Sequence, residues 1–523
     1  MKKYLLSALI LAASLEITAQ ETTVSDALRY SISDLNGTAR FRGLSGAFGA
    51  VGGDLSAINV NPAGSSIFNY NSATGTISNF NTKNNSSYFG TNTSDNESAF
   101  DINQIGGVLV FGDKQGKSNW KKIAVAINYE NTNNFDNNFY VRGTNPNSSI
   151  SNYFLNFANT GNNGGIIPID LVELQPGESI SELYTYLASF SNGFAAQQAF
   201  LGYQAFLYDY NDGVTPDPDV PDNAPYYMSN VPGGSFYQEN RTSTTGYNSK
   251  LTGNISAEYN EKLHIGLNLN AHFTDYRVNS VVYERNSNNP ALGVQQIQFE
   301  NEIYTYGGGF SFNLGAILKV SKEFRIGAAY ESPTWYHLND ELTQGLVATS
   351  HDGSNTFTDA VYPQVTNVYE PYNIQTPGKL TGSLAYIFGK NGFISFDYGR
   401  KDYSQTKFRP QNSDTFNALN SEISNSLTAA NEFRIGAEYK IKQISLRGGY
   451  RFEESPYKDK QKFDDLKGYS AGLGFNFKGS RLDLAYSYAE RDSQMRLISS
   501  GMNDTAKVTT KNNNVSLSYT IDF

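Results

Sequence analysis

One motif in the sequence resembles a catalytic nucleophile. Residues 468–472 read G-Y-S-A-G, and in enzymes with a G-x-S-x-G pattern the serine lies on a sharp turn between a strand and a helix. Here Ser470 instead opens an alternating stretch in which Ala471, Leu473 and Phe475 share one face, as in a β-strand. We therefore expect no esterase activity, assign no catalytic residue and predict that the protein is not an enzyme.

Histidines and aspartates are the candidate metal ligands. His264 and His272 fall on the same polar face of one predicted strand, but eight residues of strand separate them by about 26 Å, too far to share a metal ion. Both are expected to line an interior, with axial haem ligation as the alternative. Asp209, Asp212 and Asp217 belong to a proline-rich acidic loop and form a weak Ca²⁺ candidate, because their spacing is not that of an EF-hand. We predict no bound metal and no cofactor.

Four arginines on polar faces of alternating segments are candidates for binding a ligand carboxylate. They are Arg325, Arg434, Arg447 and Arg451. A lone guanidinium in an interior of low dielectric is costly, so each must pair with an anion. That anion is either a ligand or one of the acidic residues predicted nearby, which are Glu438, Glu453, Asp397 and Asp483. The second alternative is a structural ladder of ion pairs.

The strands that would position these residues are clearest at the C-terminus. Val515, Leu517, Tyr519, Ile521 and Phe523 alternate with polar residues without a slip, which predicts a strand with one apolar and one polar face. Fourteen such segments can be counted between residues 73 and 523, and closed bacterial barrels have an even number of strands. Very short connections, such as those at residues 260–261 and 320–321, alternate with longer polar ones, as periplasmic turns alternate with outer loops. We predict an all-β fold, a 14-stranded antiparallel transmembrane barrel with its apolar faces toward lipid.

Composition and the first residues are compatible with export. Tyr (36), Phe (33) and Gly (47) are abundant, while charged residues make up 17%. The net charge of −10 argues against a nucleic-acid partner, and the absence of cysteine excludes disulfides and thiolate zinc sites. Residues 1–19 combine a basic start, a short apolar run and Ile17-Thr18-Ala19 as a cleavage site, which predicts a signal peptide.

Two further segments differ from barrel wall. Residues 20–72 are dense in Gly and Ala and end in the turn Asn61-Pro62-Ala63-Gly64, which suits a compact hatch inside the barrel, so residues 73–523 form the barrel itself. Residues 132–246 form the longest connection, and apolar spacing between residues 180 and 210 predicts that this extracellular insertion is partly helical.

These motifs resemble the FadL/TodX (OMPP1) family of outer-membrane transporters of hydrophobic compounds. The resemblance rests on R-G-L-S-G-A-F-G-A at residues 42–50, on D-L-S-A-I-N-V-N-P-A-G at residues 54–64, and on the hairpin at residues 431–457. It implies a bacterial outer-membrane protein that takes up hydrophobic molecules passively, long-chain fatty acids first, by movement of the hatch and sideways exit through the wall. Either Gly106-Gly107 or the glycines at residues 307–309 are candidate positions for that exit.

The resemblance also implies partners. They are a fatty acid or other hydrophobic ligand, outer-membrane lipids and the barrel-assembly machinery, for which Tyr519, Ile521 and Phe523 would form the terminal signal. We expect a monomer. The alternative function is a surface receptor or adhesin, haem binding included, built on the 132–246 insertion.

Overall fold

The structure is a computed structural model that describes residues 22–113, 117–161, 164–212, 225–410 and 414–523. The predicted signal peptide and Asp217 lie outside the described residues. Among the helices of the described ranges, none has both the length and the apolar character needed to cross a bilayer.

Fourteen antiparallel strands close into a barrel, which confirms the predicted fold class. The sheet closes where β1 (Ser72–Tyr88) pairs with β22 (Thr505–Asp522) in a register that runs from Ser72↔Asp522 to Ser87↔Lys507. The wall between them contains β2 (Thr91–Gly112), β3 (Trp120–Asn134), β7 (Phe236–Tyr259), β8 (Leu263–Arg285), β9 (Leu292–Lys319), β10 (Phe324–Glu331), β15 (Lys379–Ile387), β16 (Gly392–Asp402), β18 (Ala429–Ile441), β19 (Ile444–Glu453), β20 (Leu466–Asn476) and β21 (Ser480–Arg496).

Four wall strands are interrupted and continue as separate segments. The continuations are β4 (Asn137–Asn145) after β3, β11 (Trp335–Asp352) after β10, β14 (Tyr372–Gln375) before β15, and β17 (Lys407–Arg409) after β16. Two of the four breaks contain a proline, Pro333 between β10 and β11 and Pro377 between β14 and β15, where the missing N–H prevents a regular ladder. Two short segments, β12 (Thr356–Val361) and β13 (Asn367–Val368), and the 3₁₀ turn η5 (Tyr403–Gln405) complete this region.

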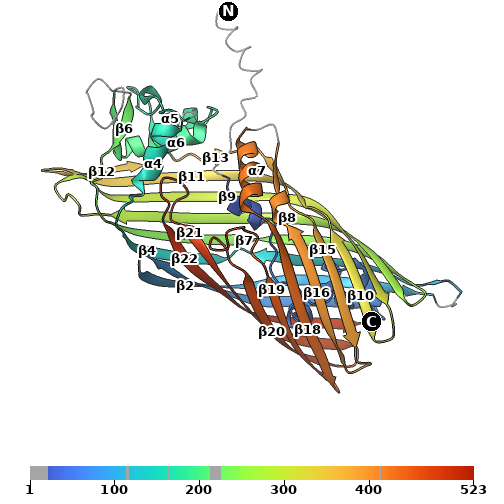
Figure 1. The fold of residues 1–523 in the computed structure, drawn as a ribbon. Helices are drawn as coiled ribbons and strands as arrows, with labels where there is room; N and C mark the ends of the chain where they lie inside the picture. The colour runs from blue at the N-terminus through green and yellow to red at the C-terminus, as the bar shows by residue number, and fades with distance from the viewer. Residues whose placement is uncertain (1–21, 114–116, 162–163, 213–224, 411–413) are drawn as a thin grey trace, which may run out of the picture.

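The alternation predicted from the sequence sets the two faces of the wall. In β10, Phe324, Ile326 and Tyr330 are 36%, 38% and 38% exposed toward the outside, while the alternate residues of the strand face inward. The terminal residues Tyr519, Ile521 and Phe523 belong to the same outward row, and the backbone N–H of Phe523 donates to the carbonyl of Asn71 at 2.9 Å. The C-terminus therefore lies at the end of the barrel with the short turns (Figure 1).

Strand length differs sharply around the barrel. β7, β8 and β9 have 24, 23 and 28 residues, whereas β10 and β15 have 8 and 9. The long strands extend beyond the apolar band and carry a cap at the opposite end from the C-terminus (Figure 1). The cap contains α4 (Ser151–Thr160), η3 (Ile169–Leu171), α5 (Ile180–Leu187), α6 (Gly193–Gln204), β5 (Tyr208–Asn211) and β6 (Tyr226–Ser229).

The cap differs in its limits from the predicted insertion. Helices α5 and α6 lie within the cap, and residues 137–145 and 236–244 of the predicted insertion are wall strands paired with each other. One buried carboxylate fixes the cap to the wall. Glu284 of β8 accepts hydrogen bonds from the backbone N–H of Ile150 at 2.8 Å and from Gln238 Nε2 at 2.7 Å, just before α4 begins. Burial raises the pKa of Glu284 to about 7.

The N-terminal residues form a plug inside the barrel. We use this name for residues 22–71, which contain α2 (Val24–Arg29), α3 (Ala39–Arg42), η1 (Ala57–Asn59) and η2 (Pro62–Ile67). Helix α2 packs with α7 (Asp414–Ser426), the helix of the β16–β18 connection, in one apolar cluster with Tyr336 and Phe408. The rest of the plug contacts inward side chains of strands from β1 to β22.

Candidate functional site

The plug body is held in place by hydrogen bonds from its most compact turns. Asn61 caps η2 by accepting from the N–H of Ala63 at 3.1 Å, and its Nδ2 donates to the carbonyls of Gly49 at 2.8 Å and Ala316 at 3.0 Å. The same turn is tied to β7, because Asn254 Nδ2 donates to the carbonyl of Pro62 at 3.0 Å. The side chain of Asn61 thus joins the turn to another part of the plug and to the wall.

Inward glycines provide the room for these close approaches. A Cβ at Gly266 would lie 2.4 Å from the carbonyl carbon of Pro62, and one at Gly315 would lie 2.1 Å from Asn61 Oδ1. The same holds for Gly327 against Gly49 and for Gly436 and Gly449 against Leu44. The wall therefore contains a belt of glycines, on five strands, that matches the surface of the plug.

A buried ionic cluster connects the plug to the late strands. Arg40 Nε of the plug lies 3.0 Å from Glu438 Oε2, and the same carboxylate lies 2.7 Å from Arg447 Nε. Arg447 also reaches Asp483 at 2.7 Å, and Asp483 in turn lies 2.5 Å from Arg481. Each charge has a partner of opposite sign, so the ion pairs offset the desolvation cost of burying these side chains. The cluster therefore leaves little room for a ligand anion.

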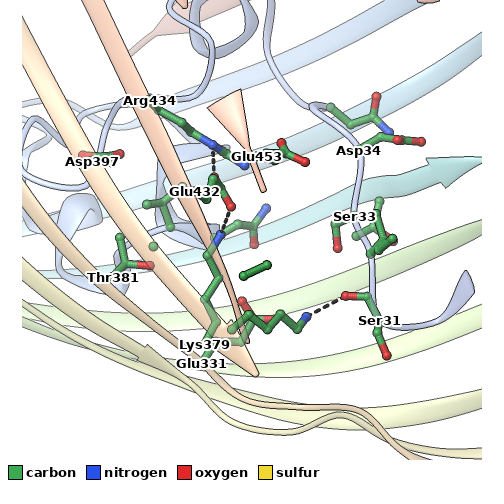
Figure 2. Close-up of a pocket in the computed structure, with 18 of the residues that line it drawn as sticks. Ser31, Ser33, Asp34, Glu331, Lys379, Thr381, Asp397, Glu432, Arg434 and Glu453 are labelled. Carbon is green, nitrogen blue, oxygen red and sulfur yellow. Dashed lines mark hydrogen bonds and ion pairs between the residues drawn. The ribbon is translucent and has the colours of Figure 1, made fainter. Parts of the chain in front are cut away.

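A polar chamber of about 140 Å³ lies between the plug and the wall (Figure 2). Its lining includes the plug linker from Ser31 to Asn36 and charged side chains from many strands. They are Glu130, Lys250, Glu331, Lys379, Asp397, Lys401, Glu432, Arg434, Glu453, Glu454 and Arg491.

Most cations of the chamber are paired. Lys379 Nζ lies 2.6 Å from Glu432, which also pairs with Arg434, and Lys401 Nζ donates to the carbonyl of Ser31 at 2.7 Å (Figure 2). Lys250 is different, because it is buried and has no hydrogen bond or salt bridge to any residue that the structure describes, and its electrostatic attraction to Glu130 acts at longer range.

The plug linker contributes a second unsatisfied group. Asn36 is 3% exposed, and neither its Oδ1 nor its Nδ2 has a hydrogen-bond partner among the described residues. Since buried polar groups are normally hydrogen-bonded, both Asn36 and Lys250 require a polar occupant of the chamber, either water or the polar part of a ligand.

A second cavity of about 290 Å³ is also lined by the plug linker, and Asp34 lines both cavities. Its lining combines Asn and Thr side chains with aromatic rings and two guanidinium groups, those of Arg29 and Arg451. The Arg29 guanidinium lies 3.9 Å from the centre of the Tyr276 ring and 2.7 Å from Asp26, so it is already engaged.

The structure separates the four arginines predicted to meet a carboxylate. Arg434 lines the first cavity and Arg451 the second, paired with Glu432 and Glu453 respectively. Arg447 belongs to the ionic cluster, and Arg325 donates to the carbonyl of Val51 in the plug at 3.0 Å. The ladder of ion pairs therefore accounts for three of the four, and no single site contains them all.

The remaining predicted residues occupy structural positions. His264 Nδ1 lies 2.7 Å from Ser66 Oγ of the plug, and His272 Nε2 lies 2.8 Å from Ser311 Oγ. Ser470 lies within β20 and contacts Ser45 Oγ at 2.8 Å. Asp209 and Asp212 lie at the ends of β5, and within the described ranges no group of three or more His, Asp or Glu side chains is arranged to hold a metal ion.

Sequence reasoning did not select Lys250, Arg40 or Asn36. Lys250 had a usable signal, because it lies on the inward face of β7 and is followed by Leu251, which belongs to the outward, lipid-facing row. Asn36 lies in an irregular segment and Arg40 in the single turn of α3, and neither segment is long enough to show a periodic pattern, so the sequence indicates no facing direction for them.

Together these features define a plugged outer-membrane channel with a charged chamber in its lumen. The profile of the family described as "Outer membrane protein transport protein (OMPP1/FadL/TodX)" matches residues 224–523, which is more than half of the chain. The protein belongs to this family, whose members are outer-membrane channels for hydrophobic compounds.

Several solved structures are similar to this chain at low identity. A Pseudomonas aeruginosa FadL homologue is 12% identical, with a TM-score of 0.51 over 94% of this chain and 100% of its own. The Pseudomonas putida toluene transporter TodX is 14% identical (TM-score 0.48, 94% and 100% covered), and the CymD monoaromatic hydrocarbon channel is 12% identical (TM-score 0.47, 94% and 99% covered). No curated protein sequence matches.

Proposed function

We propose that the protein admits amphipathic molecules that carry a carboxylate, with long-chain fatty acids as the first candidates. The observation that carries this proposal is the buried side chain of Lys250, which lines the chamber and has no hydrogen bond or salt bridge to a described residue. A ligand carboxylate at Lys250 would supply a direct ion pair, which the longer-range attraction of Glu130 does not, and Asn36 Nδ2 would donate a hydrogen bond to the same carboxylate.

The size and polarity of the chamber favour a carboxylate over an aromatic hydrocarbon. An apolar cavity of about 150 Å³ is large enough for benzene, and this chamber of about 140 Å³ is similar in size. Its walls, however, carry charged side chains whose water would be displaced by a hydrocarbon without replacement. Leaving a buried polar group without a hydrogen bond costs about 1–3 kcal/mol. A bound hydrocarbon would leave both Lys250 and Asn36 without one, so its binding free energy would include this cost twice.

The acyl chain would leave through the seam between β2 and β3. The ladder between these strands ends at Gln104↔Glu130, and Glu130 lines the chamber. Above this point β2 is joined to β4 through side chains, for example Thr93 Oγ1 donating to the carbonyl of Tyr140 at 2.5 Å. Phe100 and Ile102 beside the seam are 69% and 60% exposed, so an emerging acyl chain would meet apolar surface.

Neither glycine segment considered from the sequence interrupts the wall. Gly106 and Gly107 pair with β1 and with β3, and residues 307–309 pair with β8 and with β11. The seam proposed here begins two residues before the first of these segments.

Uptake of radiolabelled oleate by cells that express the protein tests the proposal. Lys250→Met should lower the initial rate about tenfold, whereas Lys250→Arg, which keeps the charge, should stay within about twofold of the unchanged protein. Toluene entry into the same cells should not fall with Lys250→Met. Equal oleate rates for the Met and Arg variants, at equal amounts of folded protein in the outer membrane, would refute the role of the charge.

A further inference from the structure

Every hairpin turn at the C-terminal end of the barrel carries an exposed lysine. The six turns join β2 to β3, β7 to β8, β9 to β10, β15 to β16, β18 to β19 and β20 to β21. Their lysines are Lys117, Lys262, Lys322, Lys390, Lys442 and Lys478, in that order, and all six are exposed. None of them has a salt bridge to a residue that the structure describes.

The six lysines make the end of the barrel with the short turns positively charged, whereas the chain as a whole is negatively charged. The whole protein carries −10, and the described residues between 146 and 235, at the cap end, contain six acidic residues and no Lys or Arg. In the turns themselves the acidic residues are fewer than the lysines, with Asp113, Glu261 and Glu323 as the ones nearest to the six. The two ends of the barrel therefore differ in the sign of their charge.

The lysines lie at one level, just beyond the apolar band that faces lipid. Each follows or precedes a large outward residue by no more than three positions, such as Trp120 beside Lys117, Phe388 beside Lys390 and Phe477 beside Lys478. Those three aromatic side chains are 45%, 50% and 52% exposed. An aromatic girdle marks the border of the hydrocarbon region, so an ammonium group one to three residues further lies at the level of the lipid headgroups.

We propose that this lysine ring binds the phosphate groups of anionic phospholipids in the periplasmic leaflet of the outer membrane. Short turns of bacterial barrels face the periplasm, which places the ring in that leaflet. The lysines encircle the barrel, as a shell of lipids does, whereas a soluble acidic partner would need them gathered on one side. Basic residues near an anionic lipid surface are attracted to it, and the attraction falls with ionic strength.

The two tryptophans of the chain provide local probes. Trp120 lies at the ring, its indole centre 5.0 Å from that of the Tyr259 ring, between the turns that carry Lys117 and Lys262. Trp335 pairs with Phe310 and lies away from the turns, where it is 43% exposed. The variant Trp335→Phe therefore leaves Trp120 as a probe at the level of the lysines. The variant Trp120→Phe leaves Trp335 as a probe of the wall away from the turns.

The experiment compares quenching of tryptophan fluorescence by bromine-labelled phosphatidylglycerol and bromine-labelled phosphatidylcholine with the same acyl chains. For Trp335→Phe we expect phosphatidylglycerol to compete for the site at Trp120 with a relative binding constant of about five, falling toward one at high salt. Adding Lys117→Gln and Lys262→Gln should return the constant to about one. For Trp120→Phe, in which Trp335 is the remaining probe, the relative binding constant should be about one at every salt concentration.

The matched control is Lys507→Gln, which removes an exposed charge at the other end of the barrel, paired with Asp492 at 2.8 Å. It should leave the constant at Trp120 unchanged. A constant near one for Trp335→Phe, or one that survives loss of both lysines, would overturn the proposal and leave a soluble acidic partner as the alternative occupant.

Discussion

Replacing Gly266 with alanine should unseat the plug and leave the barrel wall intact. The new Cβ would lie 2.4 Å from the carbonyl carbon of Pro62 and 2.5 Å from the backbone nitrogen of Ala63. Both are backbone atoms, so no side chain can rotate away to relieve the contact. The turn at Pro62 must retreat by about 1 Å to reach ordinary van der Waals separation.

The cost follows from what that retreat breaks. The hydrogen bonds from Asn254 Nδ2 to the Pro62 carbonyl and from Asn61 Nδ2 to the Ala316 carbonyl, both 3.0 Å, would lengthen beyond useful range. Overpacking of this kind costs about 1–3 kcal/mol and each lost hydrogen bond about 1 kcal/mol. A total near 3 kcal/mol would raise the population of barrels with a displaced plug about a hundredfold.

Conductance in planar bilayers measures that population, and Gly382→Ala is the matched control. Gly382 lies on β15 with no atom within 4 Å of its added Cβ, so this second Gly→Ala change tests backbone propensity alone. We expect more frequent openings for Gly266→Ala and unchanged behaviour for Gly382→Ala. If folded Gly266→Ala protein conducts no more than the control, the seating of the plug on the glycine belt is wrong.

Two further predictions concern buried charge. Glu438→Gln removes the anion shared by Arg40 and Arg447 and should lower the free energy of unfolding, measured by urea titration, by about 3–5 kcal/mol. The control Asp465→Asn disrupts a partly exposed pair with Lys460 and should lower it by less than about 1 kcal/mol. Burial raises the pKa of Glu284 from its usual 4.5 to about 7, so the folded cap holds a proton that the unfolded chain releases. That contribution, about 3 kcal/mol, is complete below pH 4.5 and is lost as the pH rises through 7; hydrogen exchange in residues 146–161 should quicken over this range, and Glu284→Gln should abolish the change.

The barrel was predictable because lipid on one side and a polar lumen on the other impose a period of two. In β10 and in residues 515–521 of β22 that period survives without a break, and the short turns identify the hairpins independently. Beyond the membrane the constraint disappears. Residues 91–98 of β2 read T-N-T-S-D-N-E-S, polar on both faces, so their extension into water leaves no pattern to detect, and β4 was assigned to the insertion for the same reason.

The site was less predictable, because the sequence indicates which face a residue occupies and not which partner it meets. Arg447 and Arg434 are both inward on neighbouring strands, yet one is enclosed by Glu438 and Asp483 and the other faces the chamber. The deciding contacts come from Arg40, nearly 400 residues earlier in the chain, as the bond between Arg40 Nε and Glu438 shows. Because the plug contacts strands throughout the barrel, many of the contacts that define the site join residues far apart in the sequence.

The glycine belt was visible in the sequence without being recognised. Gly327 and Gly436 stand on the polar faces of their strands, where an interior filled with water would favour side chains that hydrogen-bond. A glycine weakens a strand and has no side chain to pack, so its repetition at inward positions indicates that another backbone comes close. The plug turns at Gly49 and Leu44 are those backbones. In plugged barrels, inward glycines therefore mark the places where the plug backbone approaches the wall. The register of the strands then gives the position of each of these places around the barrel.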